Sequence, residues 1–299
     1  MLNSAIGGIS RIVRRDLARV ASGVAVEAGW IAAHVVMYPG GLLSDPANRS
    51  AHGHYNFRGF TPAQRGLVHH GVDAAATPIL LVHGIVDNHS IFTVMDRALR
   101  RRGFSDVSSF DYGLFTSDVR SAAHDLQVAV EQLCADSGYE QIHIIGHSLG
   151  GLIARYYIQR MEGHRRVHTC VTLGSPHQGT VLARMGKVVP LVRQLAPDSD
   201  LITELTLPAS DCTTRFIAFY SDIDHLILPH WNATIVHPDL RATNVAIHGV
   251  GHMSMPNNGR IAFQIASALR ELDPDNSSAA TDQTRPPSAE DDHSPRSLG

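Results

Sequence analysis

The pentapeptide Gly146-His147-Ser148-Leu149-Gly150 constrains the fold of this chain more than any other feature. It has the pattern Gly-x-Ser-x-Gly and stands between the apolar run 142–145, typical of a buried strand, and the segment 149–161, which predicts a helix. A turn this tight holds its serine in a strained conformation, and glycines remove side chains that would collide across it. We therefore expect the Ser148 hydroxyl to stand exposed at the carboxyl edge of a sheet, as a nucleophile requires.

Strands and helices alternate along the middle of the chain. Short apolar runs predict strands over 78–82, 107–110, 142–145, 167–173, 215–220 and 244–247. Helical patterns predict helices over 91–102, 117–134, 149–161 and 260–272. This alternation predicts an α/β fold with a mostly parallel, doubly wound sheet.

The composition excludes several classes of protein. With 299 residues, 43% of them hydrophobic, the chain can bury a sizeable core. A formal net charge of -3 leaves no basic excess, so we expect no nucleic-acid partner. The three cysteines are scattered and form no Cys-x-x-Cys pair, which argues against a disulfide framework and against a thiolate metal site. A reducing compartment fits this usage best, although one disulfide stays open.

The two ends of the chain differ from its middle. We expect residues 1–77 to form an N-terminal extension of helix and loop, 78–272 the catalytic domain, and 273–299 a disordered tail poor in large apolar residues. In the extension, arginines precede an apolar stretch, 20–37, that contains Glu27 and His34. This stretch is either a helix packed on the main domain or a membrane-associated segment with contact through residues 11–37. The expected location is accordingly the cytoplasm or the membrane surface.

A serine hydroxyl is a weak nucleophile until a base takes its proton. In a fold of this type the base follows the last strand and precedes the closing helix. His252 occupies such a loop and is the expected base, whereas His248 is expected to end the preceding strand.

The carboxylate that orients the base should follow the preceding strand, 215–220, where two aspartates compete. Asp224 is favoured because an apolar stretch and a proline follow it and would anchor it beside the sheet. Asp222 is the alternative, and it can instead cap the turn.

The negative charge that develops on the substrate oxygen needs two backbone donors, which form an oxyanion hole. The residue after the nucleophile, Leu149, supplies one, and the loop after the first strand supplies the other. In that loop Gly84 allows close approach, so the N–H of Ile85 is the expected second donor. His83 is expected to support the loop.

These motifs resemble the α/β-hydrolase superfamily and, within it, bacterial triacylglycerol lipases and esterases. The resemblance covers about two thirds of the chain, 78–272, and is carried by Val82-His83-Gly84, Gly146-His147-Ser148-Leu149-Gly150-Gly151, Leu173-Gly174-Ser175-Pro176-His177-Gln178-Gly179-Thr180 and Gly251-His252. It implies a Ser148–His252–Asp224 triad with Ile85 and Leu149 as oxyanion donors. The calcium site of some of these lipases has no clear aspartate pair here, so we expect no metal, and no cofactor is implied.

The segment 180–210 is too long for a simple connection and carries many apolar residues. We interpret it as a lid over the serine, with Val188 and Leu191 contacting an acyl chain. The alternative is a helical insertion packed on the core.

The sequence thus predicts a serine hydrolase that cleaves carboxylic esters, a lipase or esterase acting on an ester or lipid substrate. Alternatives are an acyltransferase or thioesterase on the same scaffold, or a non-catalytic binding protein with this fold.

Overall fold

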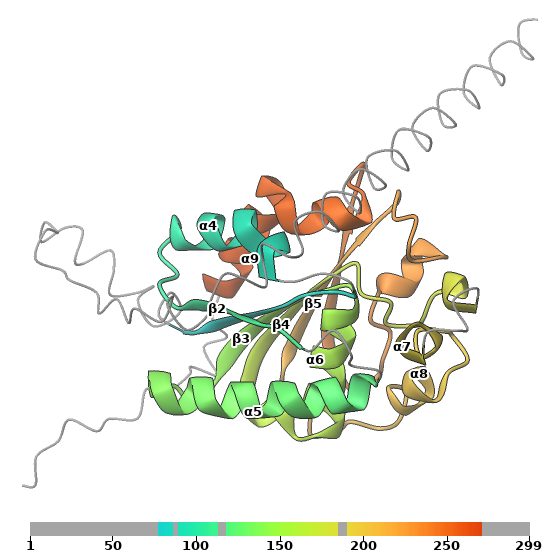
Figure 1. Ribbon diagram of the computed structural model, residues 1–299, viewed down its shortest axis with the longest axis horizontal. Coiled ribbons are helices and arrows are strands. Elements are labelled where there is room, and N and C mark those ends of the chain that lie inside the picture. Colours follow the sequence, from blue (N-terminus) through green and yellow to red (C-terminus); the bar gives the residue numbers. More distant parts are fainter. Residues whose placement is uncertain (1–76, 86–88, 113–117, 185–189, 271–299) are drawn as a thin grey trace, which may run out of the picture.

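The computed structural model describes residues 77–85, 89–112, 118–184 and 190–270 (Figure 1). Apart from Thr77, the expected N-terminal extension lies outside the described residues, and so does the tail 273–299.

Six parallel strands form one sheet. They are β1 (Ile79–Val82), β2 (Val107–Phe110), β3 (Ile142–His147), β4 (Val167–Leu173), β5 (Arg215–Ser221) and β6 (Arg241–Ile247). Their order is β2-β1-β3-β4-β5-β6, and each neighbouring pair is parallel. The predicted α/β class with a doubly wound sheet is confirmed. Strands β2 and β3 lie on opposite sides of β1, so the order of strands across the sheet reverses at β1 and β3. Ligands of such sheets bind where the strand order reverses, at the carboxyl ends of the strands.

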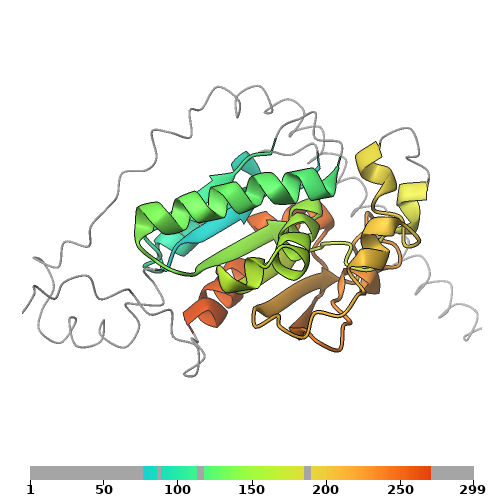
Figure 2. The ribbon, with the colours of Figure 1, turned by 90° about the horizontal axis from the view of Figure 1, so that it is seen from below.

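Helices cover both faces of the sheet (Figures 1 and 2). On one face lie α4 (Thr93–Arg100) and α9 (Gly259–Arg270), and on the other α5 (Val119–Ser137) and α6 (Leu149–Arg160). Strands β1, β3 and β4 are buried along their whole length because helices cover them on both sides. Two hydrophobic clusters result, one on each face of the sheet.

The observed bounds differ from the predicted ones at a few element ends. Helix α5 begins after Asp118, whose carboxylate accepts a hydrogen bond from the N–H of Arg120 and caps the helix. Strand β6 begins at Arg241, three residues before its predicted start. The prediction missed these residues because this edge strand is largely exposed and lacks a continuous apolar run. The helix predicted over 91–102 is shorter, since a 3-10 turn (His89–Phe92) precedes α4.

The segment between β4 and β5 contains a 3-10 turn (Val181–Arg184) and two short helices, α7 (Pro190–Arg193) and α8 (Asp200–Glu204). Both helices lie beside the start of α5 (Figures 1 and 2).

Candidate active site

Ser148 stands between β3 and α6 in a backbone conformation that residues with a side chain rarely adopt, with φ 53° and ψ −121°. Its N–H donates to the carbonyl of Leu173, at the end of β4, over 2.9 Å. A Cβ at Gly146 would lie 2.6 Å from the Cα of Gly151, so the turn needs a residue without a side chain there. The sequence therefore forces Ser148 into a strained turn at the carboxyl edge of the sheet.

Asp224 and His252 form a buried pair. Asp224 follows β5, and His252 opens the 3-10 helix His252–Asn257 after β6. The Nδ1 atom of His252 lies 2.7 Å from Oδ2 of Asp224, and each side chain is 1% exposed. The other carboxylate oxygen of Asp224 accepts hydrogen bonds from the N–H groups of Leu226 and Ile227, both at 2.9 Å. These three hydrogen bonds, shared between both carboxylate oxygens, fix one orientation of the Asp224 side chain.

The electrostatics of this pair keep Asp224 ionised. Burial alone would raise the pKa of the Asp224 carboxyl. The charge and hydrogen bond of His252, with the two backbone donors, outweigh burial and hold that pKa below its usual value.

The two competing residues, Asp222 and His248, pair with each other instead. Their Oδ2 and Nδ1 atoms lie 2.9 Å apart, and the N–H of Gly249 donates to the second oxygen of Asp222. Their side chains are 44% and 79% exposed. This pair links the two loops that follow the carboxyl ends of β5 and β6, at the surface.

Two contacts bring the Ser148 turn beside the buried pair. His147, the preceding residue, has its ring 4.9 Å from the ring of His252, and its Nε2 atom lies 3.2 Å from the His252 carbonyl oxygen. Gly174, next to the Leu173 carbonyl that binds Ser148, has φ 56°, and a Cβ there would lie 2.9 Å from Nδ1 of His252. Ser148, Asp224 and His252 therefore occupy the same edge of the sheet.

Sequence reasoning assigned no role to Gly174. The Leu173-Gly174-Ser175 motif marked this position in the sequence. The need for a glycine there arises only from the fold, where the end of β4 meets the two loops after β5 and β6.

The expected oxyanion donors lie on the two segments that flank the reversal of strand order. Leu149 is the first residue of α6, and Ile85 ends the described part of the loop after β1. A Cβ at Gly150 would collide with the carbonyl oxygens of Val82 and His83, so the start of α6 touches the end of β1. His83 supports the loop, because its Nδ1 atom lies 2.9 Å from the Gly84 carbonyl oxygen.

Much of the described part of the expected lid packs against the body of the molecule. Leu191 is 6% exposed and joins the hydrophobic cluster formed with α5 and α6. Val188 lies outside the described residues. These observations fit the insertion alternative for α7 and α8, and the lid role of 180–210 stays a prediction.

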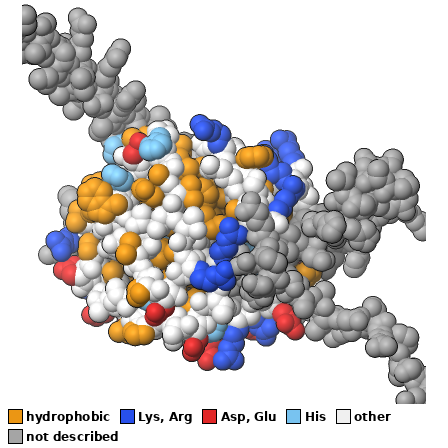
Figure 3. Space-filling model, turned by 180° about the vertical axis from the view of Figure 1, so that it is seen from behind, with side chains coloured by type: hydrophobic (Ala, Val, Ile, Leu, Met, Phe, Trp, Pro, Cys, Tyr) orange, Lys and Arg blue, Asp and Glu red, His pale blue; other side chains and the backbone are white. Residues whose placement is uncertain are grey.

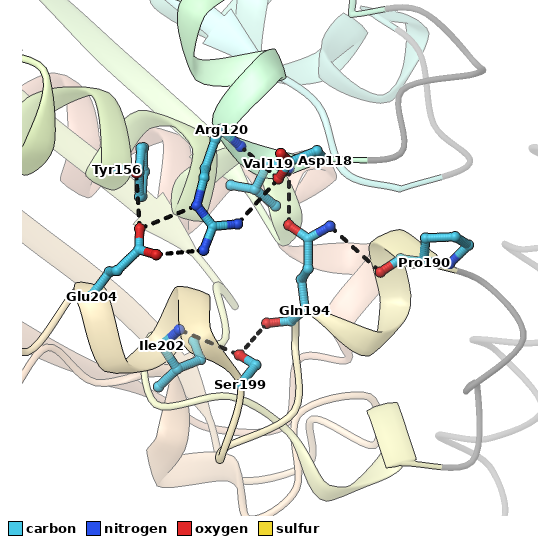
Figure 4. A network of polar contacts seen from close by, with 9 residues as sticks. All are labelled: Asp118, Val119, Arg120, Tyr156, Pro190, Gln194, Ser199, Ile202 and Glu204. Carbon is cyan, nitrogen blue, oxygen red and sulfur yellow. Dashed lines mark hydrogen bonds and ion pairs between the residues drawn. The ribbon is translucent and has the colours of Figure 1, made fainter.

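Polar contacts tie the same segment to α5 and α6 (Figure 4). Arg120 donates to both carboxylate oxygens of Glu204, and the hydroxyl of Tyr156 donates to one of them over 2.9 Å. The side chain of Gln194 accepts from the N–H of Val119, at the start of α5. The buried guanidinium of Arg155 adds bonds to the carbonyls of His177 and Leu205, and burial lowers its pKa to about 10.

Within the ranges that the structure describes, no cluster of three or more histidine, cysteine, aspartate or glutamate side chains is arranged to hold a metal ion. None of the helices described there is long and apolar enough to cross a membrane. The apolar stretch 20–37 lies outside those ranges.

Comparison with protein families finds one similar family. Residues 78–222 match the family described as palmitoyl protein thioesterase. The matched stretch contains Ser148 but ends before Asp224 and His252.

Curated relatives match only part of their own length. A triacylglycerol lipase of Pseudarthrobacter phenanthrenivorans is 28% identical over 119 residues, which are 37% of this chain and 36% of the lipase. Lysosomal thioesterase PPT2-B of Xenopus laevis is 24% identical over 121 residues, 38% of this chain and 42% of the thioesterase. The chain thus spans between a third and a half of these proteins.

Solved structures share the fold. Lipase B of Aspergillus fumigatus aligns with a TM-score of 0.59 at 16% identity, over 70% of this chain and 56% of that chain. The mature Bacillus licheniformis lipase BlEst2 aligns with a TM-score of 0.54 at 16% identity, over 66% and 92%.

Proposed function

We propose that this chain, which has an α/β-hydrolase fold and is similar to lipases and to a palmitoyl protein thioesterase family, is a serine hydrolase that cleaves carboxylic esters with Ser148, His252 and Asp224. The observation that carries the proposal is the buried Asp224–His252 pair beside the strained Ser148 turn. Strain and burial of ionisable groups both cost free energy, and both are typical of catalytic sites.

The proposed reaction begins when the Ser148 hydroxyl attacks the ester carbonyl carbon. His252 takes the hydroxyl proton on Nε2, while its Nδ1–H donates to Asp224 and so fixes the tautomer. The carbonyl oxygen becomes an oxyanion, which accepts hydrogen bonds from the N–H groups of Leu149 and Ile85. Leu149 stands at the N-terminus of α6, where the helix dipole favours negative charge.

The tetrahedral intermediate then collapses. The bond to the alcohol oxygen breaks, His252 returns its proton to that oxygen, and an acyl group remains on Ser148. A water molecule, deprotonated by His252, attacks the acyl-enzyme by the same route and releases the carboxylic acid.

An apolar substrate is supported by exposed side chains near the Asp224 loop. Val181, Leu226 and Trp231 are 41%, 36% and 56% exposed. Their segments are bonded together, since Val181 donates to the Leu228 carbonyl and Thr180 to that of Leu226. Hydrophobic side chains and histidines gather at one end of the back face (Figure 3). Contacts of Val188 and Leu191 with an acyl chain belong to the same proposal.

Thioester hydrolysis is the second candidate, because a thioesterase family model and a lysosomal thioesterase both match the chain. The same residues would act, with a thiolate as the leaving group. Acyl transfer to an alcohol differs only in the acceptor that attacks the acyl-enzyme.

The test combines labelling with substrate profiling. A fluorophosphonate should label the wild-type protein at Ser148, and Ser148→Ala should lose both labelling and hydrolysis, by about 10^4-fold or more in kcat. Matched series of p-nitrophenyl esters and acyl thioesters, from acetyl to dodecanoyl, would then separate an esterase from a thioesterase. If kcat/KM for esters rises with chain length, an acyl groove is supported, since each buried methylene contributes about 0.8 kcal/mol. Hydrolysis that persists in Ser148→Ala would overturn the proposal.

A further inference from the structure

A tyrosine from the end of the neighbouring strand holds the loop after β1. Tyr112, two residues beyond β2, donates its hydroxyl to the carbonyl of Gly84 over 2.6 Å, with the carbonyl of His83 at 3.3 Å. Its ring stacks on the His83 ring with centroids 4.4 Å apart and planes 19° apart. One side chain therefore contacts two successive residues of the loop.

His83 reinforces the same carbonyl. Its Nδ1 atom lies 2.9 Å from the Gly84 oxygen, which can only accept, so this nitrogen is the donor. Its other ring nitrogen lies 3.4 Å from the carboxylate of Asp111, and the ring is 4% exposed. The Gly84 carbonyl thus accepts hydrogen bonds from both Tyr112 and His83. The two rings are held in place by stacking on each other, and His83 also contacts Asp111.

The strand order gives these contacts a direction. Strand β1 lies between β2 and β3, so Tyr112 and Ser148 flank the loop from opposite sides. A peptide unit is planar and trans, so its C=O and N–H point in opposite directions. A Gly84 carbonyl held toward the β2 side therefore turns the N–H of Ile85 toward the β3 side, where Ser148 follows the strand.

We propose that Tyr112 is a positioning residue that holds the Gly84–Ile85 peptide in the orientation the oxyanion hole needs. This rests on the hydrolase function proposed above. A glycine peptide rotates more easily than any other, because Gly84 has no Cβ to restrict it. The phenol hydroxyl blocks that rotation, so the N–H of Ile85 is aimed before the oxyanion forms.

The test is Tyr112→Phe, which removes the hydroxyl and keeps the ring that stacks on His83. We expect kcat on a p-nitrophenyl ester to fall about 10- to 100-fold, less than loss of a whole oxyanion donor, with KM within about twofold of the wild type. An alkyl trifluoromethyl ketone forms a hemiketal oxyanion with a reactive serine. Its inhibition constant should rise by the factor by which kcat/KM falls.

Tyr156→Phe is the matched control. This variant also loses a tyrosine hydroxyl that donates to an oxygen, here the carboxylate of Glu204. Neither Tyr156 nor Glu204 belongs to the loop after β1. We expect its kcat and its inhibition constant to stay within about twofold of the wild type, and thermal melts of both variants should show comparable stability.

The outcomes separate this inference from the function on which it rests. If the wild type hydrolyses esters and is labelled at Ser148, but Tyr112→Phe keeps its kcat, only the positioning role is overturned. The role is also overturned if kcat falls while the inhibition constant for the ketone is unchanged, because the loss then lies outside the oxyanion. A wild type that neither turns over esters nor is labelled would overturn both proposals.

Discussion

The Nδ1 atom of His252 lies 2.7 Å from Oδ2 of Asp224 with both side chains buried, while the same pairing between His248 and Asp222 is repeated nearby at the surface. The two pairs have similar geometry and different surroundings. In the buried pair, low polarity strengthens the charge-assisted hydrogen bond, whereas solvent weakens it in the exposed pair.

This contrast predicts a ranking of two matched substitutions. Asp224→Asn should lower kcat about 10^4-fold, because an amide neither fixes the His252 tautomer nor stabilises its charged form. Asp222→Asn should change kcat by less than about twofold. Steady-state kinetics on one ester decides the ranking, and the reverse order would move the orienting role to Asp222.

The strained backbone of Ser148 predicts a gain in stability when the side chain is removed. Ser148→Gly should raise the free energy of unfolding by about 1 kcal/mol, because glycine adopts this region without the cost that other residues incur. Ser148→Ala is the control, since it loses the hydroxyl but keeps the Cβ and its strain. Urea unfolding of the two inactive variants measures the difference, and equal midpoints would show that the turn stores no strain.

Gly174 and Gly138 offer a second matched pair. Both have positive φ, but a Cβ at Gly174 would lie 2.9 Å from Nδ1 of His252 and 3.1 Å from Oδ2 of Asp224, whereas one at Gly138 meets nothing within 4 Å. Gly174→Ala should therefore displace the pair and reduce kcat by about 10-fold or more, on the scale that misplaced catalytic groups show. Gly138→Ala should lose about 1 kcal/mol of stability and keep its kcat. Equal kcat in the two variants would contradict the predicted contact.

His143 on β3 predicts that stability falls at mildly acidic pH. Its side chain is fully buried, and burial lowers its pKa from 6.5 to about 3. Between these values the unfolded chain binds a proton that the folded chain does not, so stability is complete above pH 6.5 and falls as the pH decreases toward 3. The expected slope is up to about 1.4 kcal/mol per pH unit for this group.

His143→Phe, which keeps an aromatic ring but cannot titrate, measures that contribution. Denaturant unfolding between pH 7 and 4 should give a shallower loss for the variant than for the wild type. Residual pH dependence is expected, because the pKa of buried His177 is lowered for the same reason. Parallel curves for the two proteins would assign the acid sensitivity to other groups.

Local sequence patterns predicted the buried elements well and the exposed ones less well. Strand β4 has its predicted bounds because a continuous apolar run is its whole signal. Strand β6 was predicted too short, since an edge strand with polar residues gives no such run. Apolar residues such as Leu191 could not distinguish a lid from an insertion packed on the core, because burial in the core and contact with an acyl chain require the same residue types.

The candidate site divides in the same way. Chain order and loop position led to Asp224 and His252, which the fold brings within hydrogen-bonding distance. Chain order could not reveal Tyr112, whose contact with Gly84 crosses 28 residues and depends on β2 lying beside β1. The requirement at Gly174 was equally hidden, because the atoms that would clash with a side chain come from two other loops.

The contact between the start of α6 and the end of β1, where Gly150 leaves no room for a side chain, has a consequence for how this scaffold can diversify. Main chain meets main chain there, so how closely the start of α6 approaches the end of β1 is set by the backbone and by the absence of a side chain at Gly150. In the proposed hydrolase, substrate preference can then change through the surrounding loops, such as those carrying Val181 and Trp231, without altering this backbone contact. For the proposed reaction, the backbone contact beside the oxyanion donors and the choice of substrate are in this sense separately adjustable parts of one molecule.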